Sequence, residues 1–409
     1  MLQQRREKGI QRRLGTLLTY YWVPLAACLL TRLLDILLIE VVSAHQVSTD
    51  DFADNAYIHV HHPADPGFLG VATNWDGQWY QTIAEHGYPG DLPTDHHGVV
   101  TMNPWAFLPL YPTLVRVLMP LTGGSFVVAA SLVSVLTSTI AFCWLYRLVR
   151  EHAGPWLAAG LVIAINAFPA APTFVTAYSE GLGLLVVVAA LDLLRRRRYG
   201  WFCVAMIVLG FTRPIAIAFG PVVVLHALMR RRQEGPLPRT TYGGLALAAA
   251  STAVGFVLWP LTAALVTGRL DAYPKTQAAW ADPGAGWESW LVSSWTMGAA
   301  MTFVVGVAVA AAGWMLFRPD ARRWPVELRF WAASYSAFLL ASARPTPSII
   351  RYGMLTLIFC FPFAELGWRS SRRVRGLIVA AIAVGAVVMH YVWLDGWFIL
   401  SEEQLVGYP

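Results

Sequence analysis

The stretch NWDGQWYQTIAEHGYPG (74–90) places titratable side chains among four aromatic rings in an otherwise apolar chain. Asp76, Glu85 and His86 are the groups in it that could take part in proton chemistry. A carboxylate at the level of a membrane is costly, and it is by default a candidate functional group. Asp76 would serve equally well as the N-cap of a helix. Residue spacing alone leaves both interpretations of Asp76 open.

The middle of this stretch predicts a helix with Trp79 and Tyr80 on a shared apolar side. Trp and Tyr at this density suit a helix that lies in the membrane interface. Gly87 and Pro89 predict the end of the helix. The segment NPWAFLPLYP (103–112) follows, and its three prolines exclude a regular span there.

The composition indicates an integral membrane protein formed by one domain, residues 1–409. Of the 409 residues, 56% are hydrophobic and only 13% are charged, whereas a soluble domain carries about 25% charged residues. The net charge of +6 does not indicate a nucleic-acid partner, because the arginines lie in short runs between apolar segments, as positive-inside anchors do. The four cysteines fall inside apolar runs without a CxxC pair, which predicts neither disulfides nor a metal site.

The apolar segments predict an all-α, polytopic bundle of about eleven transmembrane helices, since each span needs about 20 apolar residues. The expected spans are 17–43, 124–146, 155–170, 178–194, 199–212, 214–229, 241–267, 298–317, 327–343, 351–368 and 375–394.

The region 199–229 is too short for two straight spans, which would need about 40 residues. Arginine runs flank it on both sides, so an even number of crossings is expected. Two short helices that meet at GFTRP (210–214) satisfy both conditions, and a single kinked helix is the alternative. Such a break is tolerated where the backbone is buried in protein or lines a wet cavity.

The arginine clusters all fall on one side if the spans alternate, which predicts a multi-pass plasma-membrane protein with a cytoplasmic N-terminus. The first outer loop, 43–121, then holds eight acidic residues and has no lysine or arginine before Arg116. A second outer loop spans 268–297, and a shorter outer turn spans 343–352. Any chemistry is therefore expected at the outer membrane surface.

WDGQWYQTIAEHGYP followed by FLPLYP resembles the first-loop motif of the PIG-V-type mannosyltransferases. This family includes the second mannosyltransferase of GPI-anchor assembly and bacterial relatives, and the likeness here is to a bacterial, actinobacterial-type member. AYSEGL (177–182), FTRP (211–214) and RPTPSIIRYGMLTLIFCFP (344–362) resemble further family segments in the same order. The His-rich inserts at 59–62 and 96–97 match nothing in the family.

The resemblance implies a GT-C-like membrane glycosyltransferase that uses a polyprenyl-phosphate-linked sugar, mannose in the family, and inverts the anomeric carbon. Asp76 matches the catalytic acidic residue of the first outer loop and would deprotonate the acceptor hydroxyl. The phosphate leaving group needs cationic stabilisation. Arg213, Arg344 and Arg351 are the candidates, because arginine pairs bidentately with phosphate.

Several candidates keep a structural alternative. Glu180 could be a first-turn acid favoured by the helix dipole, Glu85 and His86 could face water, and the arginines could be interfacial anchors. The histidine inserts lack a spacing tied to one metal geometry, so no metal ligand is assigned and the help of a divalent metal is left open. The candidate substrate-binding residues are Trp75, Gln78, Tyr80, Glu85, His86, Glu180, Arg213, Arg344, Arg351 and Tyr352.

Two other functions compete with glycosyl transfer. A transporter or lipid flippase would place ionisable residues deep in several spans and show two related halves, whereas the polar residues here gather at one face. A catalytically inactive scaffold is the second rival, and an intact Asp76 argues against it. The acceptor could be a membrane glycolipid, a lipoglycan or a protein hydroxyl.

Overall fold

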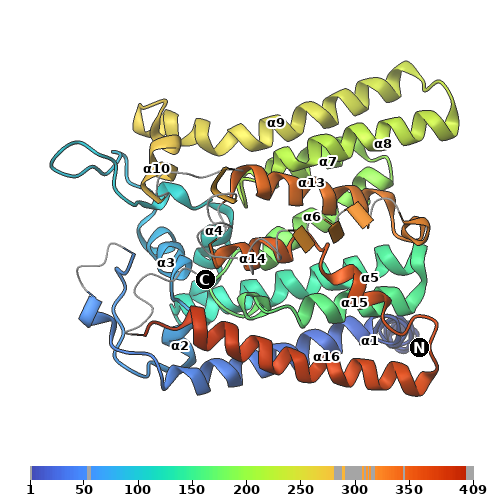
Figure 1. Cartoon of the computed structure of the whole chain (residues 1–409), viewed down its shortest axis with the longest axis horizontal. Helices are drawn as coiled ribbons and strands as arrows, with labels where there is room; N and C mark the ends of the chain where they lie inside the picture. The colour runs from blue at the N-terminus through green and yellow to red at the C-terminus, as the bar shows by residue number, and fades with distance from the viewer. Residues whose placement is uncertain are drawn as a thin grey trace.

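The structure, a computed structural model, is a bundle of helices (Figure 1). The structure describes residues 2–52, 57–280, 288–290, 306–307, 310–311, 313–314, 318–343 and 346–401. In these parts every element is a helix, apart from one isolated bridge between Thr94 and Val100. The all-α fold predicted from the sequence is confirmed. The expected span at 298–317 lies largely outside the described residues, and the number of eleven spans stays a prediction.

The main helices run along the long dimension of the molecule, with α1, α5 and α16 on one side and α8 and α9 on the other (Figure 1). Three described helices, α5, α9 and the continuous stretch Arg372–Phe398, are long and apolar enough to cross a membrane. The main helices are α1 (Leu2–Ser43), α5 (Phe126–Asn166), α6 (Glu180–Arg195), α7 (Tyr199–Gly210), α8 (Phe219–Glu234), α9 (Arg239–Thr267), α13 (Val326–Ser342) and α16 (Arg372–Trp393).

The outward faces of the long helices are apolar, as lipid contact requires. On α1, for example, Leu30 and Leu37 are well exposed, and Leu377 and Val384 are so on α16. The interior is filled by large rings such as that of Trp331, which is fully buried. Apolar residues outside as well as inside are typical of a helix bundle in a bilayer.

α5 is a helical hairpin that contains two of the predicted spans, 124–146 and 155–170. Gly154 interrupts it with a φ of 85° that glycine adopts without cost. Arg150 contacts Tyr20, and Asn166 contacts Arg32. Since Tyr20 and Arg32 lie along α1, the chain approaches the N-terminal half of α1 and then turns back along it.

The predicted broken pair at 199–229 is confirmed. α7 ends at Gly210, and α8 begins at Phe219 after the short helix η5 (Ala216–Ala218). The break packs tightly against α9, because a Cβ on Gly210 would lie 2.2 Å from the carbonyl oxygen of Gly255. The backbone at the break is therefore buried in protein, which is where such a break is tolerated.

The expected span at 351–368 is wrong as one continuous helix. The chain forms α14 (Ser348–Met354) and α15 (Cys360–Glu365), separated by a turn in which Leu357 has a φ of 63°. Almost every side chain from 353 to 361 is buried. The run is apolar because it is buried inside the protein. Its composition is the same as that of a run that contacts lipid, so the sequence does not distinguish the two.

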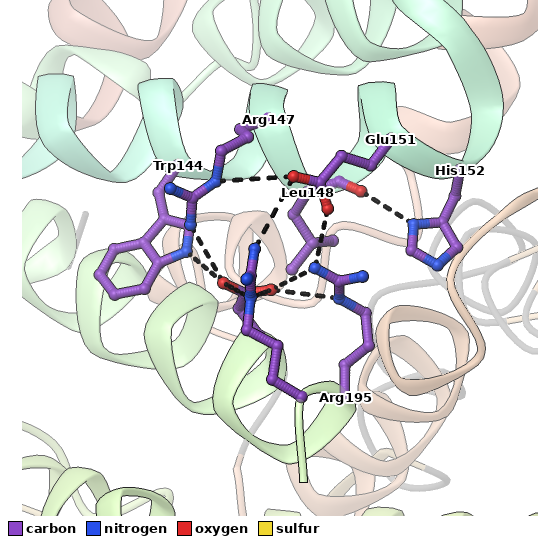
Figure 2. Close-up of polar contacts among 8 residues, drawn as sticks. Trp144, Arg147, Leu148, Glu151, His152 and Arg195 are labelled. Atoms are coloured by element: carbon purple, nitrogen blue, oxygen red, sulfur yellow. Dashed lines mark hydrogen bonds and ion pairs between the residues drawn. The ribbon is translucent and has the colours of Figure 1, made fainter. Parts of the chain in front are cut away.

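The arginine clusters lie together at one end of the bundle, as expected. Figure 2 shows the central contacts, where Arg195 reaches Glu151 on α5 at 2.9 Å. Arg197 pairs with Glu234 at 2.6 Å. The guanidinium of Arg375 lies 4.7 Å from the ring of Trp156. That this end is cytoplasmic stays a prediction.

The opposite end, on the left in Figure 1, is built from the first predicted outer loop and from α10. Its helix α3 begins at Asp76 and ends at His86, close to the predicted bounds, and the next residue, Gly87, has a φ of 83°. The elements at this end are η1 (Thr49–Phe52), α2 (Gly67–Val71), α3 (Asp76–His86), η2 (Pro104–Ala106), α4 (Leu110–Leu118), η3 (Met119–Thr122), η4 (Ala171–Phe174), α10 (Ala272–Trp280) and η7 (Leu394–Phe398). The short helix η6 (Pro319–Arg323) lies at the arginine end.

The aromatic rings of α3 differ from the expectation that they anchor in the lipid interface. Trp79 is buried and stacks on Phe107 at 5.8 Å. Tyr80 is buried against Phe107 and Tyr111. Trp75 donates from Nε1 to the carbonyl oxygen of Phe398 at 2.8 Å. Protein contacts rather than lipid contacts fix the position of α3.

Candidate active site

Four charged residues from distant parts of the chain meet at the end formed by the first loop. We call Asp76, Glu180, Arg213 and Arg351 the charged quartet. Arg351 Nη1 donates to Asp76 Oδ2 and also to Glu180 Oε1, the latter at 3.1 Å. Arg213 Nη1 lies 2.9 Å from the same Glu180 oxygen. The chain therefore joins α3, α6, the α7–α8 break and α14 through ionic contacts.

The quartet is balanced in charge and unequal in exposure. The charges of its two arginines and two carboxylates sum to zero, and buried charges need such pairing. The exposed fraction of the side chain is 0% for Glu180, 3% for Arg351 and 10% for Arg213, but 24% for Asp76. Asp76 is therefore the member of the quartet that an incoming molecule meets.

Asp76 is not the cap of α3, so the alternative interpretation as an N-cap is wrong. The N-cap is Trp75, whose side chain makes no capping bond, and Asp76 is the first residue of the helix. Trp75 has a φ of 58° and ψ of −116°, a conformation that a bulky residue seldom adopts. Such strain is found at functional sites, where the surrounding structure holds it. Here it turns the chain into α3 so that Asp76 reaches Arg351.

Glu180 is the first residue of α6, and glycines in that helix make room for its partners. A Cβ on Gly183 would lie 2.7 Å from Arg213 Cδ, so the arginine stem passes where only a glycine fits. A Cβ on Gly181 would lie 2.8 Å from the carbonyl oxygen of Ser134 on α5. The sequence EGLG thus holds α6 close to α5 and admits Arg213 to the quartet.

Ser179 links the quartet to α3 through a hydrogen-bond chain. Its Oγ accepts from Arg213 Nη1 at 3.1 Å and from the Tyr80 hydroxyl at 2.9 Å. Burial raises the pKa of the Tyr80 phenol well above its ordinary value, with a further contribution from nearby Asp76, so this hydroxyl keeps its proton. Ser179 was absent from the predicted site, although its place beside Glu180 in AYSEGL was a usable signal.

Aromatic rings line the guanidinium groups. The Cζ atom of Arg351 lies 4.9 Å from the ring centres of both Tyr178 and Tyr352. Arg213 Cζ lies 5.5 Å from the Tyr352 ring. Such contacts stabilise a cation by about 0.5–2 kcal/mol each. The ring faces hold the two guanidinium groups in place, and the Tyr352 hydroxyl also accepts from Arg351 Nη2 at 3.4 Å.

Part of the hydrogen-bonding capacity of the quartet is unused. Among the described residues, Arg213 Nε, Arg351 Nε and Glu180 Oε2 are buried without a hydrogen-bond partner. Buried polar atoms normally have partners, and exceptions need a reason. The site therefore contains two arginines with spare donors for an anion and a partly exposed carboxylate that could take a proton.

Other predicted site residues lie elsewhere. Gln78 is buried, and its Oε1 accepts from the backbone N–H groups of His59 at 2.8 Å and Val60 at 2.9 Å. Glu85 and His86 are exposed on α3. Arg344 lies outside the described residues. Gln78 thus fastens a loop in this structure, and the quartet includes neither Glu85 nor His86.

The histidine insert at 59–62 fastens the first loop. His59 Nε2 contacts the Thr82 hydroxyl at 2.9 Å, and His62 Nε2 contacts the Thr73 hydroxyl at 3.1 Å. Burial lowers the pKa of both imidazoles, which favours their neutral forms. In the part of the chain that the structure describes, no group of three or more His, Cys, Asp or Glu side chains could hold a metal ion.

A second buried charged cluster lies within the predicted spans and was missed. Asp35 accepts from Arg32 at 3.0 Å and contacts His390 Nδ1 at 2.7 Å, and Arg32 donates to Asn166 at 2.9 Å. These contacts join α1 to α16 and to the end of α5. Charged residues inside an apolar span were the available signal.

Comparison with solved structures identifies the fold. The chain resembles ArnT from Cupriavidus metallidurans with a TM-score of 0.51 and 16% identity, over 90% of this chain and 63% of ArnT. It also aligns with the oligosaccharyltransferase AglB from Archaeoglobus fulgidus, with a TM-score of 0.49 and 12% identity, over 96% of this chain and 57% of AglB. No protein-family model and no curated protein sequence matches the chain.

The likeness to ArnT confirms the fold class predicted from the sequence, a GT-C-like membrane bundle. The chain spans less than two thirds of the length of either solved structure. At this identity the likeness concerns the fold, so what the chain does must be argued from its own residues.

Proposed function

We propose that the protein is a membrane glycosyltransferase that moves a sugar from a polyprenyl-phosphate donor to an acceptor hydroxyl, with inversion. The charged quartet is the observation that carries the proposal. It offers a partly exposed carboxylate beside two buried arginines with unused donors. The solved structure of ArnT, whose fold is similar, is bound to undecaprenyl phosphate.

In the proposed reaction, Asp76 takes the proton of the acceptor hydroxyl as its oxygen attacks the anomeric carbon. The bond between that carbon and the phosphate oxygen breaks on the opposite face, which inverts the configuration. Polyprenyl phosphate leaves with one more negative charge and needs no proton. Arg351 and Arg213 would stabilise this developing charge, as preorganised cations do in a site shielded from water.

The finer assignments rest on the motifs in the sequence. WDGQWYQTIAEHGYP and FLPLYP support mannose as the sugar and a PIG-V-type enzyme. The arginine-rich end supports a plasma-membrane protein with a cytoplasmic N-terminus and an outward-facing site. A glycolipid or lipoglycan is the proposed acceptor class, because both present hydroxyls at the membrane surface where Asp76 lies.

The direct test is incubation of the purified protein in lipid nanodiscs with polyprenyl-phosphate-mannose and a membrane lipid extract. Mass spectrometry should detect an acceptor whose mass has grown by one hexose, and the Asp76→Asn protein should form little of it. Other polyprenyl-phosphate sugars, tested in parallel, decide the donor. Failure of every donor, together with lipid scrambling by the wild-type protein in vesicles, would support a flippase instead.

A further inference from the structure

We infer that Asp76 and the donor phosphate compete for Arg351, so the lipid donor binds first and its arrival releases Asp76 toward the acceptor. The inference rests on the proposed function and adds an order of binding to it. In the structure the proposed base is held by the proposed phosphate ligand. Both cannot serve in the reaction while that ion pair lasts.

Charge balance excludes simple addition of a phosphate to the quartet. The two arginines are already neutralised by the two carboxylates, and Arg351 Nη1 contacts both of these. A phosphodiester would bring a third negative charge into a site where Arg351 and Glu180 are 3% and 0% exposed. Like charges in a buried site strongly disfavour one another. One carboxylate must therefore move away or bind a proton.

Asp76 is the carboxylate that can move. Glu180 is fully buried at the start of α6, and its Oε1 is held by Arg351 and Arg213 together. Asp76 is 24% exposed, and within the described part of the chain its side-chain partner is Arg351. Rotation of its short side chain would bring the carboxylate toward the open side without disturbing α3. Glu180 is thus a positioning residue that keeps the two guanidinium groups side by side.

The exchange also sets when Asp76 can act as a base. While the ion pair lasts, Asp76 Oδ2 accepts from Arg351 and is not free to accept from an acceptor hydroxyl. Once the phosphate takes the place of Asp76 on Arg351, the released carboxylate can face the acceptor hydroxyl and accept its proton. The base is then active only when a donor is in place.

Binding of polyprenyl phosphate, the leaving lipid, to nanodisc-embedded protein tests the competition. Asp76→Asn removes the competing charge and should tighten binding by about tenfold, equivalent to about 1.4 kcal/mol. The matched control is Asp192→Asn, which removes a carboxylate that pairs with Arg147 and Arg195 at the opposite end of the bundle. It should leave binding unchanged. Weaker or unchanged binding by the Asp76→Asn protein would overturn the inference.

The two proposals fail in different ways. If Asp76→Asn abolishes transfer without tightening binding, Asp76 is the base and the competition is wrong. If it tightens binding and transfer persists, the competition holds and another group is the base.

Labelling of the wild-type protein gives a second test that needs no variant. A water-soluble carbodiimide with glycine methyl ester modifies accessible carboxylates, which peptide mass spectrometry can locate. Saturating polyprenyl phosphate should raise labelling of Asp76 several-fold, while Glu180 stays unlabelled. Protection of Asp76 by the lipid, or no change, would contradict its release.

Discussion

The charged quartet and the cluster around Asp192 lie at opposite ends of the bundle, and they use charge differently. Asp192 Oδ2 accepts from Trp144 at 2.9 Å and from Arg147 at 3.1 Å, and its Oδ1 accepts from Arg195 at 2.7 Å. These contacts join neighbouring helices near a turn, as Figure 2 shows for the labelled residues. Both oxygens of Asp192 are occupied.

The quartet instead joins four elements that are distant in sequence. Among the described residues it leaves a carboxylate oxygen, Glu180 Oε2, and two arginine Nε atoms without hydrogen-bond partners, whereas the Asp192 cluster leaves only an arginine nitrogen, Arg147 Nε, in that state. The Asp192 cluster joins the C-terminal end of α6 to α5. A charged cluster is therefore a candidate site when one of its carboxylates keeps an unpaired oxygen and another is accessible. The number of charges in the cluster does not decide this.

The largest expected effect is labelling or no labelling of a thiol, and it tests which compartment each end of the bundle faces. His97→Cys places a thiol on an exposed loop beside the quartet end, and Gln233→Cys places one on the exposed end of α8. In intact cells an impermeant maleimide should label the first variant and not the second, because the arginine-rich end is expected inside. The reverse pattern would place the quartet in the cytoplasm.

Asp76→Asn should lower the transfer rate by about 10²–10⁴-fold, the usual contribution of general-base catalysis. Asparagine keeps the size of the side chain and can still donate or accept hydrogen bonds, but it cannot take the proton. Single-turnover transfer of a radiolabelled sugar, with a thermal unfolding profile as a folding control, measures the effect. Near-native transfer by a folded variant would make Glu180 the next candidate.

Arg351→Lys should reduce transfer by about 10–100-fold while keeping the positive charge. Lysine loses the planar guanidinium, whose Nη1 contacts both Asp76 and Glu180, and hydrogen bonds to charged groups are worth about 1.5–3 kcal/mol. Steady-state kcat/KM for the lipid donor is the measurement. Arg375→Lys at the arginine-rich end is the control, and equal losses in both variants would remove the distinction between the two ends.

Gly183→Ala should cost about tenfold in the same kcat/KM, because the new methyl group would displace the Arg213 stem. The matched control is Gly200→Ala on α7, where nothing lies within 4 Å of the added Cβ. Both variants put alanine into a helix, where it is favoured over glycine. If Gly183→Ala transfers as well as Gly200→Ala, the position of Arg213 does not matter for transfer.

Local patterns predicted much of this architecture. The bounds of α3 followed from turn residues, and the break at 210–214 followed from the length available for two spans. Both features depend on residues that are close in sequence. The division of 351–368 into α14 and α15 could not be predicted, because an apolar run looks alike against lipid and inside protein.

The charged residues show the same limit. Asp76 and Arg351 were candidates from their motifs, but no local pattern states that they bind each other across 275 positions. The Arg32–Asp35–His390 cluster was visible as charges within spans, yet its partners come from three helices. Which charged residues contact each other depends on the tertiary packing of the helices.

The smallest expected effect on transfer is that of Asp192→Asn, which should stay within about twofold of the wild type. The variant removes the charge that Arg147, Arg195 and Arg196 share, but these arginines are 19–45% exposed, so water screens what is lost. A modest fall in thermal stability, of about 1–2 kcal/mol, is expected because Asp192 itself is only 3% exposed. Parallel transfer assays and unfolding profiles separate the two effects. A loss of transfer comparable to that of Asp76→Asn would mean that both clusters serve the reaction, and that retained binding capacity does not distinguish a site from an anchor.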